Sequence, residues 1–286
     1  MKAARAAAAL AAVAFGCAAY IYVTLPDVRP LRTSNPATTA FMELRAAQAR
    51  AKGEAPRRVH RWVSYDRMSP HLTRAVVVAE DAGFWRHSGI DLGQIRESLE
   101  VNIQRREIAR GASTITQQLA KNLYLSPSKN PVRKLREMLI ARRLEAELDK
   151  RRILELYLNL IEWGDGVYGA EAAARTHFGK SAAALGPEEA ALLAGAIVSP
   201  RVLSPGRPSA RLRQRQGLIL RRMGGGRAQP APIGPIEPEG IREVPADEGL
   251  KPVPPLPEPP EGGCARVLPL LLLRDFVDIA AEQAYS

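Results

Sequence analysis

Apolar residues recur at helical spacing through the middle of the chain. Between Pro131 and Asn159 no Pro or Gly interrupts the pattern, and the apolar positions change from one helical face to another near Asp149 and Lys150. This change predicts two helices that meet at these two residues. Residues 188–198 form a nearly continuous apolar run, which predicts a buried helix ended by the proline that follows.

The amino end of the chain has a different pattern. Residues 6–26 contain no charge and follow two basic residues, so we expect a transmembrane anchor of roughly 20 residues after a cytoplasmic amino terminus, residues 1–5. Small residues around Cys17 also permit a cleaved signal peptide. A lipoprotein site at Cys17 is disfavoured by the bulky residue two positions before it. In either of the first two cases the rest of the chain lies outside the cytoplasm.

Residues 36–224 form the predicted globular domain. We expect a mainly α fold, because Ala and Leu dominate and aromatic residues make up only 5% of the chain. Residues 36–61 mix apolar and basic side chains, which predicts either an amphipathic stretch at a membrane surface or an ordinary helix. Prolines concentrate in residues 225–264, as in an extended linker, and residues 265–286 predict a short apolar helix or a frayed tail.

The formal net charge of +11 indicates a polyanionic partner, such as nucleic acid, anionic lipid or a phosphate-bearing substrate. The chain lacks the interleaved aromatic and basic residues of nucleic-acid-binding proteins, so we expect no nucleic acid. Cys17 and Cys264 show no zinc-binding spacing, and the four histidines show no metal-binding pattern. A metal site built from histidine or cysteine is therefore not expected.

The segment AVVVAEDAGFWRHSGID, residues 75–91, ends an apolar helix in Glu80 and Asp81. A carboxylate at the edge of an apolar helix is partly desolvated, which raises its pKa and suits a general base. The structural alternative is that Glu80 caps a neighbouring helix or pairs with Arg86. This segment alone favours the structural alternative.

The segment RGASTITQQLAKNLYLS, residues 110–126, gathers neutral donors with one cation. Hydroxyl, amide and ammonium groups on one helix surface suit phosphate or sugar oxygens, although a solvated amphipathic helix is the simpler explanation. The candidate substrate-binding residues here are Ser113, Thr114, Gln117, Gln118, Lys121 and Asn122.

A second carboxylate follows in VRKLREMLIARRLEAELDKRRILELYLN, residues 132–159. Arg133 lies four residues and Lys134 three residues before Glu137, so all three share one helix face. Flanking cations keep such a carboxylate ionised. An ordinary helix salt bridge is the commoner outcome of this spacing.

Four strings of the chain, taken in order, resemble the peptidoglycan glycosyltransferase family, which comprises the glycosyltransferase domain of class A penicillin-binding proteins and stand-alone relatives. The strings are EDAGFWRHSGID, GASTITQQLAKNLYL, RKLRE and RRILELYLNLIEWGDGVYGAEAAARTHFGKSA. They cover residues 62 to about 205, and the last string is most similar to the monofunctional members.

The resemblance implies a mainly α fold with a lysozyme-like lobe and a smaller membrane-proximal lobe. It implies that lipid II is polymerised onto a growing glycan strand with inversion and release of undecaprenyl pyrophosphate, at the periplasmic side of the bacterial inner membrane. The two family glutamates fall on Glu80 and Glu137, and the pyrophosphate-binding positions fall on Lys121 and Arg133. Arg86 and Lys134 complete the candidate substrate-binding set.

The resemblance also implies a divalent cation, Mg²⁺ or Mn²⁺, with unidentified ligands. Glu137 then either positions the neighbouring cations or shares that metal ion with the pyrophosphate. S-x-x-K at residues 126–129 is read as coincidence, so no transpeptidase activity is expected. The alternative functions are a lytic enzyme of lysozyme-like fold and a non-catalytic scaffold that recruits cell-wall or division proteins through the Pro-rich tail.

Overall fold

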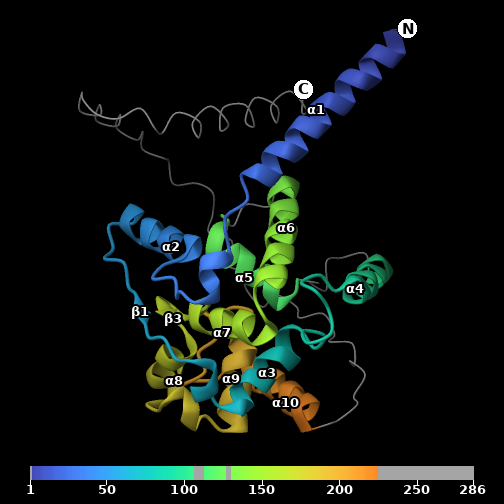
Figure 1. Cartoon of the computed structure of the whole chain (residues 1–286). Coiled ribbons are helices and arrows are strands. Elements are labelled where there is room, and N and C mark those ends of the chain that lie inside the picture. The colour runs from blue at the N-terminus through green and yellow to red at the C-terminus, as the bar shows by residue number, and fades with distance from the viewer. Residues whose placement is uncertain (1, 106–112, 127–129, 225–286) are drawn as a thin grey trace, which may run out of the picture. The chain divides into compact units, whose positions relative to one another are not determined.

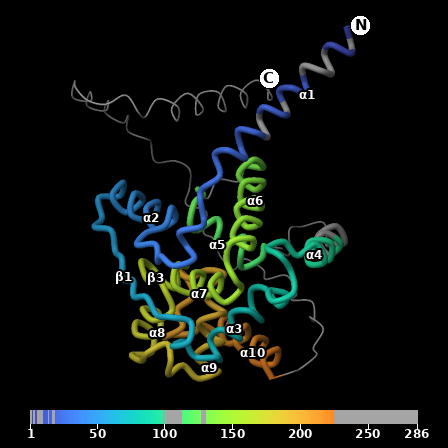
Figure 2. Tube along the Cα trace, viewed as in Figure 1, coloured from blue at the N-terminus to red at the C-terminus, as the bar shows by residue number. Residues whose placement is uncertain are grey.

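The computed structural model describes residues 2–105, 113–126 and 130–224 (Figures 1 and 2). Helices dominate this part of the chain, which confirms the predicted mainly α class. The α-helices are α1 (Lys2–Val23), α2 (Ala40–Ala51), α3 (Pro70–Glu80), α4 (Leu92–Arg105), α5 (Ile115–Tyr124), α6 (Pro131–Glu147), α7 (Lys150–Leu160), α8 (Ala170–Phe178), α9 (Pro187–Ala196) and α10 (Ala210–Gly224). The shorter elements are the 3₁₀ turns η1 (Arg29–Arg32), η2 (Tyr65–Arg67) and η3 (Ala182–Ala184) and the strands β1 (Val59–His60), β2 (Glu162–Gly164) and β3 (Val167–Tyr168).

Two groups of helices share one hydrophobic core. Helix α5 packs against α6 and α7, while α3 packs against α9 and α10, as Figure 1 shows for the second group. Leu119 of α5, Leu154 of α7 and Val76 of α3 are fully buried in this core. Burying a side chain of this size contributes roughly 1.5–3 kcal/mol. The core therefore holds the carboxyl end of α3 in a fixed place relative to α5.

Helix boundaries follow local sequence signals. Helix α6 ends at Glu147 and α7 begins at Lys150, and between them the Asp149 carboxylate accepts a hydrogen bond from the Arg152 backbone N–H at 2.7 Å. The predicted break at this point is confirmed. Helix α9 is buried from Ala190 to its end, which confirms the predicted buried helix, although it ends at Ala196, two residues earlier than expected.

The segment predicted as either amphipathic or ordinary contains α2. Thr39 caps this helix, and its hydroxyl accepts a hydrogen bond from the Met42 backbone N–H at 3.1 Å. Met42 is buried in the common core, and α2 packs against α5. Helix α2 is thus an integral helix of the domain, and its contact with a membrane surface stays a prediction.

A small sheet in the order β1-β3-β2 was not predicted from the sequence. β1 pairs with β3 in parallel, and β2 pairs with β3 antiparallel. Strands of two or three residues are too short to show an alternating pattern. Gly169 follows β3 with φ +86°, and a Cβ there would lie 2.9 Å from the Asn159 carbonyl oxygen, so only glycine fits this close approach.

Arginines of α6 hold the carboxyl end of α1. The Arg136 guanidinium donates to the Thr24 carbonyl at 3.0 Å, and that of Arg143 donates to the Leu25 carbonyl at 3.3 Å. Within the described residues, no helix combines the length and the apolar character needed to cross a membrane. The predictions for residues 225–264 and 265–286 lie outside the described residues.

Candidate active site

Glu80 ends α3 at the border of the core. The apolar face of α3, with Val76 fully buried, carries the carboxylate to a place where its side chain is only 12% exposed. The Gln118 side-chain amide donates to Glu80 Oε2 at 3.0 Å, and Arg215 Nη2 lies 3.7 Å from Oε1. Burial raises the pKa of Glu80, and the Gln118 hydrogen bond and the Arg215 charge partly oppose that rise. The expected direction of the shift is confirmed.

The structural alternative for Glu80 involved Arg86, and the structure places a different cation beside the carboxylate. Arg86 lies exposed in the turn after α3, whereas Arg215 comes from α10, 135 residues further along the chain. No pattern local to Glu80 points to Arg215. A substrate-binding role for Arg86 stays a prediction.

Asp81 organises the loop between α3 and α5. It is 1% exposed and accepts hydrogen bonds from His87 Nε2 at 2.9 Å and from the Ile115 backbone N–H at 3.0 Å. The Gly89 backbone N–H donates to His87 Nδ1 at 3.2 Å, so the ring proton resides on Nε2. The Thr114 hydroxyl donates to the Gly89 carbonyl at 2.6 Å. These bonds fix the start of α5 to the end of α3 and so bring Gln118 to Glu80.

Three predicted substrate-binding residues have structural contacts within α5. Thr114 and Gln117 form a capping box, with reciprocal side-chain to backbone hydrogen bonds of 3.2 and 3.1 Å, and both are fully buried. The Asn122 amide donates to the Gln118 carbonyl at 2.8 Å. Of the two adjacent glutamines, only Gln118 contacts Glu80. Direct substrate binding by Thr114, Gln117 and Asn122 stays a prediction.

The second carboxylate, Glu137, lies on α6 between two cations. Arg133 Nη1 donates to its Oε2 at 2.7 Å, and Lys134 Nζ donates to its Oε1 at 2.5 Å. Lys134 Nζ also donates to Ser113 Oγ at 3.1 Å, so four of the predicted site residues form one cluster. Glu137 is only 3% exposed, while the side chains of Arg133 and Lys134 are 18% and 41% exposed. The predicted flanking of Glu137 by cations is confirmed.

Lys121 on α5 lies within electrostatic range of both carboxylates. Burial lowers the pKa of Lys121, and Arg133 and Lys134 lower it further, while Glu137 and Glu80 oppose the shift. Among the described residues, no carboxylate comes within ion-pair distance of this half-buried ammonium. A cation that lacks a close carboxylate, beside two more cations, is suited to bind an anionic ligand.

Two residues of this site were not identified from the sequence. The Tyr157 hydroxyl on α7 donates to Gln118 Oε1 at 2.9 Å, and Tyr157 is fully buried. In the sequence Tyr157 belongs to an apolar helix face, and this pattern predicts only that the side chain packs in the core. Arg215 belongs to a strongly basic helix, where neighbouring arginines give no reason to single it out.

The carboxylates that could hold a divalent cation already accept hydrogen bonds from protein groups. Both oxygens of Glu137 accept hydrogen bonds from cations, so this carboxylate does not fit a metal ion held by the protein. Asp81, His87 and Asp91 place ligand atoms within 4.8 Å of one another. However, both oxygens of Asp81 already accept hydrogen bonds, Oδ1 from His87 Nε2 and Oδ2 from the Ile115 backbone N–H. The network after α3 therefore accounts for this group without a metal ion.

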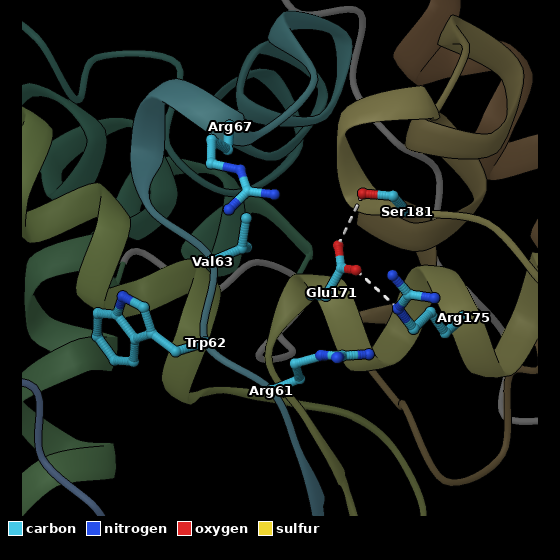
Figure 3. Close-up of a pocket in the computed structure, with 7 residues that line it drawn as sticks. All are labelled: Arg61, Trp62, Val63, Arg67, Glu171, Arg175 and Ser181. Carbon is cyan, nitrogen blue, oxygen red and sulfur yellow. Dashed lines mark hydrogen bonds and ion pairs between the residues drawn. The ribbon is translucent and has the colours of Figure 1, made fainter.

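A separate pocket of about 190 Å³ contains none of the predicted site residues (Figure 3). Its lining residues are Arg61, Trp62, Val63, Arg67, Glu171, Arg175 and Ser181. Glu171 lies at its centre and accepts hydrogen bonds from Arg175 Nε at 2.7 Å and from Ser181 Oγ at 3.1 Å, as the dashed lines of Figure 3 mark. A further bond of 2.8 Å from the Ala182 backbone N–H shows that Glu171 anchors the turn after α8.

Comparison with known proteins agrees with this geometry. The transglycosylase family profile matches residues 48–224, which include every described helix from α3 to α10. A biosynthetic peptidoglycan transglycosylase of Nitrosomonas eutropha is 49% identical over 192 residues, which are 67% of this chain and 79% of the relative. Proteins of the same name from Dechloromonas aromatica and Aromatoleum aromaticum are 47% identical over 189 residues and 52% identical over 167 residues. These alignments cover 66% and 58% of this chain, and 82% and 73% of the two relatives. The chain therefore belongs to the transglycosylase family, the family of peptidoglycan glycosyltransferases.

Proposed function

We propose that the chain polymerises lipid II, a disaccharide-pentapeptide on undecaprenyl pyrophosphate, into β-1,4-linked glycan strands. One observation carries this proposal. A desolvated carboxylate, Glu80, ends α3, and three cations of α5 and α6 gather around the second carboxylate, Glu137. A base near a group of cations suits the transfer of a sugar from a pyrophosphate to a hydroxyl group.

In this mechanism Glu80 accepts the proton of the 4-hydroxyl group of the acceptor sugar. The hydroxyl oxygen then uses its electron pair to form a bond with the anomeric carbon of the growing strand. The bond from that carbon to the pyrophosphate oxygen breaks, and the pyrophosphate leaves with the electron pair. Attack from the face opposite the α-linked leaving group gives a β bond, hence inversion. The raised pKa of Glu80 strengthens it as a base.

The cations stabilise the negative charge that develops on the leaving pyrophosphate. Lys121 provides a point charge, and Arg133 provides a planar guanidinium fork that suits phosphate oxygens. Glu137 holds Arg133 and Lys134 through bonds of 2.7 and 2.5 Å, so its proposed role is to position these two side chains. Preorganised cations of this kind stabilise a transition state without reorganisation during the reaction.

A divalent cation, Mg²⁺ or Mn²⁺, is proposed only as an ion that accompanies the pyrophosphate. When bound, it would neutralise part of the phosphate charge. The two occupied oxygens of Glu137 do not support a metal ion held by this residue, and no step of the mechanism passes through one.

The proposed location is the outer face of the cytoplasmic membrane, with residues 6–26 as a single-pass anchor. Support comes from the absence of charge in residues 6–26, from the basic residues that precede them and from a lipid-linked substrate. The net charge of +11 favours contact with anionic lipids. The Pro-rich residues 225–264 are proposed as a tether toward cell-wall or division proteins.

The experiment that tests the function uses the purified full chain and fluorescent lipid II with Mg²⁺. We expect a ladder of glycan polymers that forms in the presence of a β-lactam and disappears after digestion with a muramidase. As a control, the Glu80→Gln protein is assayed at the same concentration. Release of short fragments from preformed glycan, without polymer formation from lipid II, would show a lytic enzyme instead.

A further inference from the structure

We propose that Tyr157 and Arg215 are positioning residues for the Glu80 carboxylate and leave Oε1 as the oxygen that takes the proton. Tyr157 acts through the side chain of Gln118, and Arg215 acts directly. This inference rests on the proposed function, because it assigns partners to the proposed base. In the mechanism above neither residue contacts the substrate, and both act only on the orientation and charge of the Glu80 carboxylate.

Tyr157 fixes the orientation of the Gln118 amide. Its hydroxyl donates to Gln118 Oε1 at 2.9 Å, and the Gln118 Nε2 group donates to Glu80 Oε2 at 3.0 Å. Tyr157 is fully buried, so water does not replace its hydroxyl as a donor to the amide oxygen. A rotated amide would turn its oxygen toward the carboxylate and lose the second bond. The carboxylate of Glu80, which only accepts when ionised, thus requires the amide NH2 to face it, and the buried Tyr157 hydroxyl holds the amide in this orientation by donating to its oxygen.

Arg215 reaches Glu80 from α10. Its Nη2 lies 3.7 Å from Glu80 Oε1, beyond ordinary hydrogen-bond distance but within range of an ion pair. The Arg215 Nε atom is buried and has no hydrogen-bond partner within the described part of the chain. The close packing of α10 on α9 sets this position, since a Cβ on Gly195 would lie 3.0 Å from Leu212 Cδ1 and 3.6 Å from Arg215 Cγ. A small residue at Gly195 therefore allows Arg215 to lie beside Glu80.

Gln118 and Arg215 contact different oxygens of the Glu80 carboxylate, and at different distances. Oε2 accepts a 3.0 Å bond from Gln118, whereas Oε1 faces a guanidinium at 3.7 Å. The oxygen that already accepts a short hydrogen bond has less capacity for another donor. Oε1 thus remains available to the hydroxyl proton of the acceptor sugar, and Arg215 stabilises its charge without occupying it.

The charged and titratable groups around Glu80 come from several elements. Those that act on it are Asp81 beside it, Lys121 of α5, Tyr157 of α7 and Arg215 of α10. Helix α9 packs Ala and Leu side chains against α3, and its Glu189 pairs with Lys180 at 2.8 Å. Gln118 and Arg215 therefore supply the largest contributions that oppose the effect of burial on Glu80.

The test is the pH dependence of kcat/KM for lipid II polymerisation by full-length Tyr157→Phe and Arg215→Gln. Each change removes a group that favours the ionised carboxylate, so we expect the acidic limb of the profile to move to higher pH. Activity at the acidic side should fall about three- to tenfold, as for the loss of one hydrogen bond, and recover at higher pH. Arg215→Lys keeps the positive charge, so its acidic limb should lie close to that of the unmodified protein.

The matched controls are Tyr168→Phe, a buried tyrosine of β3, and Arg213→Gln, an exposed arginine of α10. Both should keep the acidic limb of the unmodified protein. If Arg215→Gln and Tyr157→Phe behave like these controls while Glu80→Gln is inactive, the positioning inference fails alone. If Tyr157→Phe does not fold, the comparison of Arg215→Gln with Arg215→Lys decides. Full activity of Glu80→Gln would instead overturn the proposed base.

Discussion

The two carboxylates of the site lie in opposite environments. Glu80 is desolvated at the end of an apolar helix, and its nearest partner is a neutral amide at 3.0 Å. Glu137 is more deeply buried, and an arginine and a lysine donate to its two oxygens at 2.7 and 2.5 Å. The first carboxylate keeps one oxygen without a short hydrogen bond, and the second keeps none.

This difference separates two tasks that one residue type performs. A base must hold a proton for part of the reaction, which a raised pKa and an available oxygen permit. A carboxylate whose two oxygens accept hydrogen bonds from two cations instead fixes the positions of those cations. Residues with the same chemistry are therefore assigned to different roles by their neighbours, and Lys121 lies within electrostatic range of both.

The largest effect that separates the two roles is expected for Glu80→Gln. The amide keeps the shape of the side chain but accepts no proton, so the polymerisation rate should fall about 10²–10⁴-fold. Turnover is measured with fluorescent lipid II, and circular dichroism checks the fold. Near-normal turnover by the folded variant would remove Glu80 from the role of base.

We also expect the stability of the Glu80→Gln protein, relative to the unmodified protein, to depend on pH. Because burial raises the pKa of Glu80 above its ordinary value of 4.5, the neutral carboxyl is favoured in the folded state. This contribution to stability is complete below pH 4.5 and is lost as the pH rises through the folded-state pKa. Glu80→Gln should therefore be at least as stable as the unmodified protein at pH 7–8, and its advantage in thermal unfolding should shrink toward pH 4.5.

The next largest effect is expected for Lys121→Ala and Arg133→Ala, which remove charge at the proposed pyrophosphate site. Loss of one preorganised donor typically lowers kcat about 10²–10³-fold. Arg142→Ala changes an exposed arginine of α6 and serves as the matched control. The assignment of these cations would be contradicted if Lys121→Ala and Arg133→Ala both polymerised limiting lipid II as fast as the Arg142→Ala control.

A smaller effect should separate the two adjacent glutamines. Gln117→Ala breaks the capping box of α5 and should lower the free energy of unfolding by about 1 kcal/mol, with kcat little changed. Gln118→Ala removes the bond to Glu80 and should lower kcat with less effect on stability. Thermal unfolding and polymerisation are measured for both variants. These roles would be refuted if Gln117→Ala lowered mainly kcat and Gln118→Ala lowered mainly the free energy of unfolding.

The smallest effect is expected for a chain truncated after Gly226. The family match ends at residue 224, and the Pro-rich composition that follows does not predict a packed core, so polymerisation should continue at close to the full-length rate. Both chains are assayed in the same detergent. A large loss of activity in a folded truncated chain would show that residues after Gly226 contribute to the catalytic domain.

The sequence predicted those parts of the site that depend on local spacing. The apolar run before Glu80 predicted its burial, and the i, i+3 and i, i+4 spacing around Glu137 predicted its two ion pairs. The break between α6 and α7 followed from the change of apolar face at Asp149. Local patterns succeed here because each partner lies within one helical turn or one helix face.

The remaining features depend on contacts between distant segments. Arg215 meets Glu80 only because α10 packs on α9 and α3, and the Tyr157 hydroxyl has a partner that is 39 residues away. The apolar pattern of α7 is the same whether Tyr157 only packs in the core or also donates a hydrogen bond from its buried hydroxyl. Nor does the sequence distinguish Gln117 from Gln118, since adjacent residues of a helix point about 100° apart and the surroundings decide which one faces Glu80.

The central claim, that Glu80 is the base and Glu137 positions cations, is tested most directly by the pH profile of kcat/KM for Glu137→Gln. Lipid II polymerisation is followed between pH 5 and pH 9 for this variant and the unmodified protein. We expect a lower plateau, on the order of tenfold, with the acidic limb at the same pH in both proteins. Loss of the acidic limb in Glu137→Gln would identify Glu137 as the titrating base and contradict the division of roles proposed for the two carboxylates.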